Sequence, residues 1–269
     1  MIKIRYLHLL RRVVGRAAFA FTAILPLQAA AAPDEIVVFT DEFEKTGEIG
    51  VDLHFNYAAK ASRVPGFPGE QAPHHVFRFM PEVVWGLAPT WNLGLHIPMS
   101  HDFTNGANTV DGIKIRLHNL HTRENVSGGT MFWGANYEVS SYRRRISEMN
   151  AAFEVRGILG WRSDDWMVAI NPILIKPFFA VPGQRNDIEL DVFGKVMRTV
   201  RSDFAVGLEH YSNLGRIRNP DFGPISGQTT YLVAEYTTKS GMEIHAGVGQ
   251  GWTSPVDTRV YKVLLGLPF

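Results

Sequence analysis

The chain has 269 residues, with 27 Lys and Arg against 26 Asp and Glu and a formal net charge of +1. This near balance gives no electrostatic reason to expect a nucleic-acid partner. The chain contains no cysteine, which excludes disulfides as a source of stability.

Residues 1–32 have the features of a cleaved secretory signal. Basic residues come first, a short apolar run follows, and small residues precede Pro33. An N-terminal membrane anchor is the alternative, but the apolar run is shorter than a membrane-spanning helix requires. We therefore predict a signal peptide over 1–32, cut near Ala31 or Ala32, and a single domain over 33–269 that works outside the cytoplasm.

Apolar and polar residues alternate along the rest of the chain. Ile49, Val51 and Leu53 share one face of an extended segment, for example, while Asp52 and His54 share the other. Helical periodicity is nowhere sustained. The period-two pattern predicts roughly a dozen strands, long enough to cross a bilayer when tilted, over 49–57, 77–87, 91–99, 113–118, 133–139, 153–161, 166–174, 188–196, 204–208, 232–236, 242–248 and 261–269.

The connections between these segments alternate in length. Tight turns are predicted at 88–90, 162–165, 200–203 and 238–241. Longer connections, rich in Pro, Gly and polar residues, are predicted at 60–75, 100–111, 141–150, 177–187 and 214–228. Short turns on one rim and long loops on the other are typical of up-and-down barrels in the bacterial outer membrane. The stretch "HTRENVSGG" at 121–129 is an exception, because it is expected to be short and is not.

A soluble all-β sandwich or barrel also alternates apolar and polar positions. The six tryptophans favour a membrane protein, because all lie at or near predicted strand ends, where aromatic girdles meet the two interfaces. The predicted fold is therefore an all-β transmembrane up-and-down antiparallel β-barrel of about 12 strands in the bacterial outer membrane.

If the apolar face contacts lipid, the opposite face lines the lumen. A barrel of this size is expected to have a narrow lumen that loops can obstruct. Mixed charges there can line a wet channel or lock the barrel through internal ion pairs. The predicted lumen-lining residues are Asp52, His54, Arg78, Glu82, His96, Lys114, Arg116, His118, Glu138, Glu154, Arg156, Glu189, Asp191, Lys195, Glu209, Glu243, His245 and Lys262.

The last strand carries a second signal. "YKVLLGLPF" resembles the C-terminal signature of bacterial outer-membrane proteins, with Tyr261 opening the set and Phe269 closing it. The resemblance implies that the barrel-assembly machinery recognises this strand during insertion. Pairing of the last strand with the first then leaves no free edge in the bilayer.

Longer features resemble one family. Residues 47–99, "NPILIKP", "FAVGLEHYSNLG" and the closing strand are similar to the outer-membrane β-barrel family named for the MetA pathway of phenol degradation. The resemblance implies a porin-like channel for small, hydrophobic or aromatic solutes and assigns no binding residue. A structural barrel with a plugged lumen remains the alternative within this fold.

A third hypothesis comes from the segment "EHYSN". His210 and Ser212 share one strand face, so His210 could activate Ser212 as a nucleophile. The segment is similar to the His-x-Ser-Asn segment of outer-membrane lipid A deacylases. Glu209 lies on the wrong face to orient the histidine, which leaves Glu235 and Glu243 as candidates. The alternative function is therefore a lipid hydrolase at the outer rim.

Metal binding has little support in the sequence. His54, His96 and His118 point inward, but no close spacing such as His-x-His occurs. We predict no metal and no cofactor. The expected partners are outer-membrane lipids and lipopolysaccharide, the assembly machinery during insertion, and a small solute that the sequence does not identify.

Overall fold

The computed structural model describes residues 35–179, 187–224, 226–253 and 256–267. The predicted signal peptide and Phe269 lie outside the described residues. Within the described residues, no helix is long and apolar enough to cross a membrane.

Strands make up nearly all of the regular structure. They are β1 (Ile49–Lys60), β2 (Val76–Ala88), β3 (Trp91–His96), β4 (Met99–Asp102), β5 (Ala107–Val110), β6 (Gly112–Val126), β7 (Gly129–Tyr142), β8 (Ala151–Arg162), β9 (Trp166–Pro177), β10 (Glu189–Arg201), β11 (Phe204–Arg216), β12 (Gly227–Thr237), β13 (Glu243–Gly251) and β14 (Arg259–Leu267).

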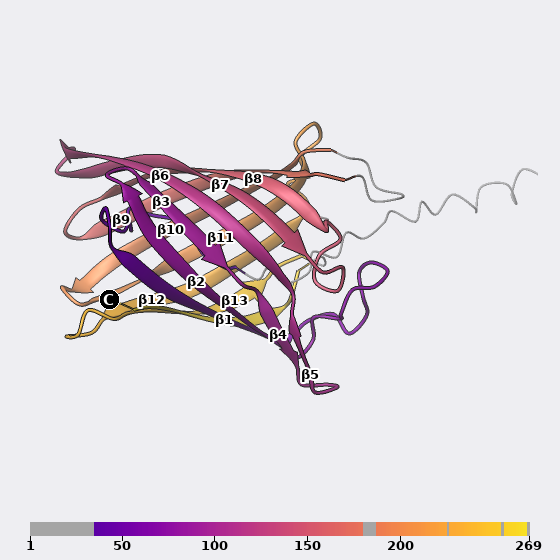
Figure 1. Cartoon of the computed structure of the whole chain (residues 1–269). Coiled ribbons are helices and arrows are strands. Elements are labelled where there is room, and N and C mark those ends of the chain that lie inside the picture. The colour runs from indigo at the N-terminus through magenta and orange to yellow at the C-terminus, as the bar shows by residue number, and fades with distance from the viewer. Residues whose placement is uncertain (1–34, 180–186, 225, 254–255, 268–269) are drawn as a thin grey trace, which may run out of the picture.

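Twelve of these strands form a closed antiparallel wall, because β1 pairs with β14 on one side and with β2 on the other (Figure 1). Closure satisfies the backbone of every wall strand without leaving an edge. The predicted fold, an up-and-down antiparallel barrel of about 12 strands, is confirmed. We call the rim that carries the turn at 88–90 the short-turn rim and the opposite one the long-loop rim.

The strand predicted over 91–99 is interrupted. β3 ends at His96, and after Pro98 the chain continues as β4, which pairs with the far end of β2 and with β5. Proline has no N–H for a ladder and interrupts pairing in a sheet interior. The hairpin β4–β5 therefore extends beyond the wall at the long-loop rim (Figure 1).

The stretch 121–129 is not a long loop. β6 continues past its neighbour β3, whose pairing ends at Asn119, and joins β7 through a two-residue turn, Ser127 and Gly128, whose φ angles are 51° and 77°. Two positive φ angles define the type I′ turn, which matches the twist of a hairpin. The expectation of an overlong connection was wrong because the extra residues lengthen the strands.

The outward positions form an apolar belt. Its members include Val83, Leu95, Ile115, Val139 and Ile170, each between 42 and 51% exposed. In water such a continuous apolar surface would be unfavourable, whereas lipid tails match it.

The lumen is not lined by polar residues alone. Inward positions also hold a buried apolar cluster, in which Ile158, Met167, Ile173 and Phe193 pack against one another. Its remaining members come largely from β6 to β14 and from residues that precede β1. The barrel therefore has an apolar core beside its charged one, which the strand alternation does not predict.

Candidate functional site

Two networks of charged side chains lie inside the barrel. The first surrounds Glu82, which is 5% exposed. Its carboxylate lies 3.1 Å from Nε2 of His54 and 3.2 Å from Nε2 of His96, and it accepts a hydrogen bond of 3.3 Å from Arg116. Arg116 also donates to Glu138 at 3.0 Å. One guanidinium thus joins two buried carboxylates from β2 and β7, which β3 and β6 separate in the wall.

The second network surrounds Glu209, which is fully buried. Its carboxylate pairs with Lys262, lies 3.5 Å from Lys195 and 3.2 Å from Nε2 of His245, and accepts a hydrogen bond of 2.6 Å from the Tyr211 hydroxyl. Buried charges are stable only when paired and hydrogen-bonded in this way.

Both networks bind a segment that the sequence patterns did not reveal. Residues 35–48, which we call the N-terminal strap, begin inside the lumen and reach the short-turn rim. Glu35 pairs with Lys114 at 2.5 Å and with Arg116 at 2.6 Å in the first network. Lys262 of the second network donates a hydrogen bond of 2.9 Å to the Ile36 carbonyl.

Two buried asparagines hold the strap backbone. The Asn171 side chain accepts a hydrogen bond from Phe39 N at 2.7 Å and donates one to Phe39 O at 3.1 Å. With its amide oxygen oriented toward Glu44 N, Asn92 makes the same pair of bonds to Glu44, at 2.8 and 3.0 Å. Asn is disfavoured in strands. Asn56 and Asn136 are also buried at inward positions, so the asparagines mark the inner face without identifying those that bind the strap.

Side chains of the strap complete its attachment. Asp41 forms a bidentate ion pair with Arg162, with Nε–O distances of 3.0 Å. The Phe39 ring lies under the guanidinium groups of Arg116 and Arg156, at 4.5 and 4.9 Å. Ile36 and Val38 enter the apolar cluster. The strap therefore fills the lumen at this level.

The structure places the predicted lumen residues as follows. Asp52, Glu154 and Glu189 are half-buried, and Glu243 is exposed at the short-turn rim. The others are buried, namely His54, Arg78, Glu82, His96, Lys114, Arg116, His118, Glu138, Arg156, Asp191, Lys195, Glu209, His245 and Lys262. Most of the buried set belongs to the two networks or contacts the strap. Tyr261 faces outward and is 44% exposed.

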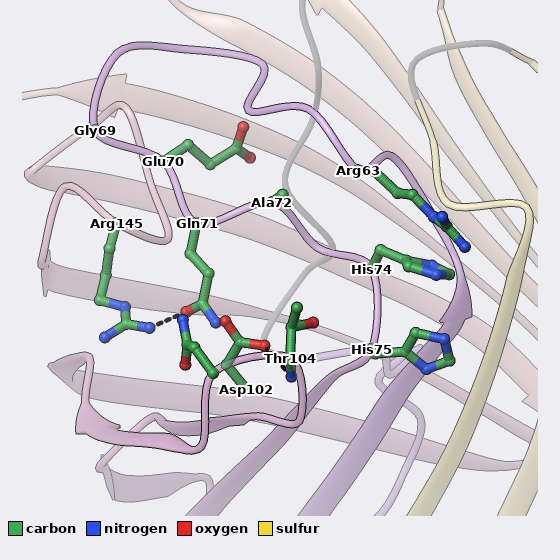
Figure 2. Close-up of a pocket in the computed structure, with 11 residues that line it drawn as sticks. Arg63, Gly69, Glu70, Gln71, Ala72, His74, His75, Asp102, Thr104 and Arg145 are labelled. Carbon is green, nitrogen blue, oxygen red and sulfur yellow. Dashed lines mark hydrogen bonds between the residues drawn. The ribbon is translucent and has the colours of Figure 1, made fainter.

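A cavity of about 670 Å³ lies among the loops of the long-loop rim. Arg145 and Gln71 lie on one side of it and Arg63, His74 and His75 on the other (Figure 2). Arg145 donates a hydrogen bond to Gln71 (Figure 2). The lining carries both charge signs beside apolar surface, so its composition does not select between polar and apolar solutes.

Two carboxyl groups at this rim have altered acidity. Burial raises the pKa of Asp257 to about 7, and nearby Glu70 raises it further while Arg78 opposes the shift. Burial also raises the pKa of Glu70, although hydrogen bonds from the backbone of Gly66 and Phe67 oppose that shift. The mouth therefore carries one acid group, Asp257, whose charge changes near neutral pH, and a second, Glu70, whose pKa is shifted in the same direction.

The His210 and Ser212 side chains face outward, on the lipid side of β11. They do not hydrogen-bond to each other. Nε2 of His210 and Oγ of Ser212 both donate to Oε1 of Gln228, at 2.9 and 2.7 Å, and Nδ1 of His210 lies 2.9 Å from Oγ1 of Thr230. Glu235 pairs with Lys195 inside the barrel instead of orienting His210. The neighbours of His210 are thus an amide and a hydroxyl.

No protein-family model matches the chain, and no curated protein matches its sequence. Solved structures do match its fold. The COG4313 outer membrane channel from Pseudomonas putida F1 is 12% identical and has a TM-score of 0.55, with 87% of this chain and 100% of that chain covered. The NanC porin is also 12% identical, with a TM-score of 0.51 and coverage of 82 and 98%.

At this level of identity the similarity concerns the fold. A porin, KdgM, in complex with disordered oligogalacturonate gives a TM-score of 0.50 at 13% identity, with 82% of this chain and 99% of that chain covered. The fold of this protein is therefore that of outer-membrane β-barrels.

Proposed function

We propose that the protein is a channel for small solutes in the bacterial outer membrane, with the N-terminal strap closing its lumen. The observation that carries the proposal is how the strap is held. Glu35, Asp41 and the backbone of Phe39 bind the wall through ion pairs and hydrogen bonds, which can exchange with water or solute.

Hydrophobic or aromatic solutes suit this lumen. The apolar cluster supplies an inner surface against which a ring can pack once the strap moves, and arginines beside Phe39 already hold an aromatic ring. The resemblance to the family of the MetA pathway of phenol degradation supports the same class of solute.

Single-channel recording in planar bilayers tests the proposal. The pair Glu35→Gln and Asp41→Asn keeps the chain length and removes both carboxylates of the strap that pair with the wall. We expect brief, small openings for the native protein and a conductance several-fold larger, or openings several-fold longer, for the double variant. A barrel whose lumen is permanently plugged gives no current in either case.

Solute class is tested separately. Proteoliposomes containing the double variant should take up a phenolic solute faster than they take up a sugar of similar mass. Equal rates for both solutes would leave a channel without preference for aromatic compounds.

One observation keeps the hydrolase alternative in view. His210, Ser212 and Gln228 form a hydrogen-bonded cluster on the lipid side of the wall. In this arrangement the Ser212 proton is donated to Gln228, so a nucleophilic serine requires a rotation that brings it to His210. Mass spectrometry of lipid A after incubation with native and Ser212→Ala protein decides the matter, because hydrolysis requires loss of an acyl chain with the native protein only.

We also propose that the C-terminal strand directs assembly. Deletion of Phe269 should lower the folded fraction in the outer membrane, measured by heat-modifiable migration on gels, while refolding of the purified chain into detergent stays unchanged. Equal membrane levels of the two proteins would contradict this role.

A further inference from the structure

A row of polar side chains crosses the outer face of four strands. Cross-strand pairing aligns His210, Thr230, Gln250 and Arg259, from β11 to β14. The next outward row toward the short-turn rim is apolar and 43 to 65% exposed, and it consists of Leu208, Leu232, Val248 and Tyr261. The polar row therefore limits the apolar belt on this side of the barrel.

The outward apolar positions end earlier along β11 than along β9. On β9 the outward positions are apolar from Trp166 to Leu174, whereas on β11 they are apolar only from Phe204 to Leu208. The ladders pair Ile170 with Gly194 and Gly194 with His210. His210 is thus in ladder register with the middle of the apolar face of β9, and the polar positions on β11 begin earlier along the strand than on β9.

Hydrogen bonds within the cluster make this position tolerable. The Trp252 indole donates to Thr230 Oγ1 at 2.9 Å, and Gln228 donates to Ser226 at 2.8 Å, beside the bonds of His210 and Ser212 already described. Polar groups that face hydrocarbon must satisfy one another. A belt that served only to hold the barrel in lipid has no need of such a cluster.

The end of the row at β14 is cationic. Arg259 donates to Gln250 at 2.9 Å, and Lys60 is its ladder partner on β1. Among the described residues no carboxylate lies within ion-pair distance of either, and the outward positions of β11 to β14 hold no Asp or Glu. The row thus carries imidazole, hydroxyl and amide groups on β11 to β13 and ends in two cations, Arg259 and Lys60.

We propose that this row binds the phosphorylated disaccharide headgroup of a lipopolysaccharide molecule in the outer leaflet. From β11 to β14 the row is about 14 Å wide at the usual strand spacing, which two joined sugar rings can cover and a single glycerophosphate cannot. The cations match a phosphate at one end, and the apolar row below contacts acyl chains. The proposal rests on the outer-membrane location and is independent of conductance.

Binding of diphosphoryl lipid A to the full-length protein in detergent micelles is the test. The row variant, Thr230→Val with Gln250→Leu and Arg259→Leu, extends the apolar belt. We expect it to bind lipid A at least tenfold more weakly than the native protein, which should prefer lipid A to phosphatidylglycerol. The matched control is His121→Leu, an outward histidine on β6 near the short-turn rim, and its affinity should be unchanged.

Folding is controlled by heat-modifiable migration, and a second variant, Lys60→Gln with Arg259→Gln, retains the hydrogen-bonding row while removing the charges. It should no longer bind diphosphoryl lipid A more tightly than lipid A from which the phosphates have been removed. Native affinity in the row variant, or equal binding of lipid A and phosphatidylglycerol by the native protein, overturns the proposal. If the strap variants do not conduct, the channel proposal fails, but the proposal that the row binds lipopolysaccharide is unaffected.

Discussion

Arg116 is the residue on which the first charged network depends. It is 3% exposed and contacts Glu35, Glu82 and Glu138 at distances between 2.6 and 3.3 Å. Lys114 pairs with Glu35 and Glu138 as well, so two of these three carboxylates have a second cation. Their mutual repulsion in a dry interior is balanced mainly by this one guanidinium and by Lys114.

We therefore expect Arg116→Met to lower the free energy of unfolding by about 3–5 kcal/mol, the cost of leaving buried charges without a partner. Guanidinium unfolding of the protein in lipid vesicles measures it. Arg201→Met is the matched control, because Arg201 pairs with Asp203 at an exposed site and such pairs contribute little. Equal losses for both variants would show that Arg116 is not the central cation.

Asn171 tests the attachment of the strap. The chain has no cysteine, so Val38→Cys introduces a single thiol at a position that is 1% exposed. Adding Asn171→Leu removes both hydrogen bonds to Phe39 and should raise the rate of thiol labelling by at least tenfold. Asn108→Leu, on the exposed hairpin strand β5, should leave the rate unchanged. Slow labelling in both backgrounds would mean that the other contacts hold the strap unaided.

Among the elements, the β6–β7 hairpin shows how turn chemistry sets strand length. Ser127 and Gly128 both have positive φ, a conformation that glycine adopts freely and β-branched residues resist. The adjacent pairing of Val126 with Gly129 depends on this turn.

Gly128→Val should accordingly lower the free energy of unfolding by about 1–2 kcal/mol, although a Cβ at this position meets open space. Ser127→Gly should be neutral or slightly stabilising, because it relieves the other positive φ. Both are measured by the denaturant midpoint. A neutral Gly128→Val would mean that the turn rearranges without strain.

How far the sequence predicts the structure differs between elements. The wall strands follow from period-two alternation, because the lipid and lumen sides of the wall are chemically different along most of its circumference. β9 shows the limit, since Met167, Ala169 and Ile173 face inward and are apolar. Because the inward and outward positions of β9 are both apolar, alternation does not show which face points into the lumen. Asn171 is the one polar residue that marks the inner face.

The strap was missed for a different reason. Its partners Arg116 and Lys262 lie 81 and 226 residues away in the chain, so no local periodicity reports them. Taken alone, the residues Glu35, Phe39 and Asp41 do not distinguish this segment from an ordinary linker before the first strand. The outer cluster of His210 was anticipated in part, but Gln228 and Thr230 become its neighbours only through the register of β11 with β12.

At the scale of the whole molecule, the long-loop rim should respond to pH. The pKa of Asp257 is about 7 in the folded protein, above its ordinary value of 3.8. The folded state therefore binds this proton more tightly than the unfolded state does. The resulting stability is complete at low pH, declines as pH rises from about 4 to 7, and is absent above that range.

Asp257→Asn keeps an uncharged side chain at all pH values. We expect the variant and the native protein to have the same melting temperature near pH 4, and the variant to be more stable at pH 8. The difference in melting temperature between the two proteins cancels the pH dependence that Glu70 and the histidines of the rim contribute to both. A constant difference across this range would contradict the raised pKa.

Lys262 binds both Glu209 and the carbonyl of Ile36, and it lies on β14, the strand that seals the cylinder. The strand that closes the barrel thus supplies a ligand for the first described residues of the chain. Closure of the barrel and complete attachment of the strap are consequently coupled, because the contact between Lys262 and Ile36 forms only once β14 is in place.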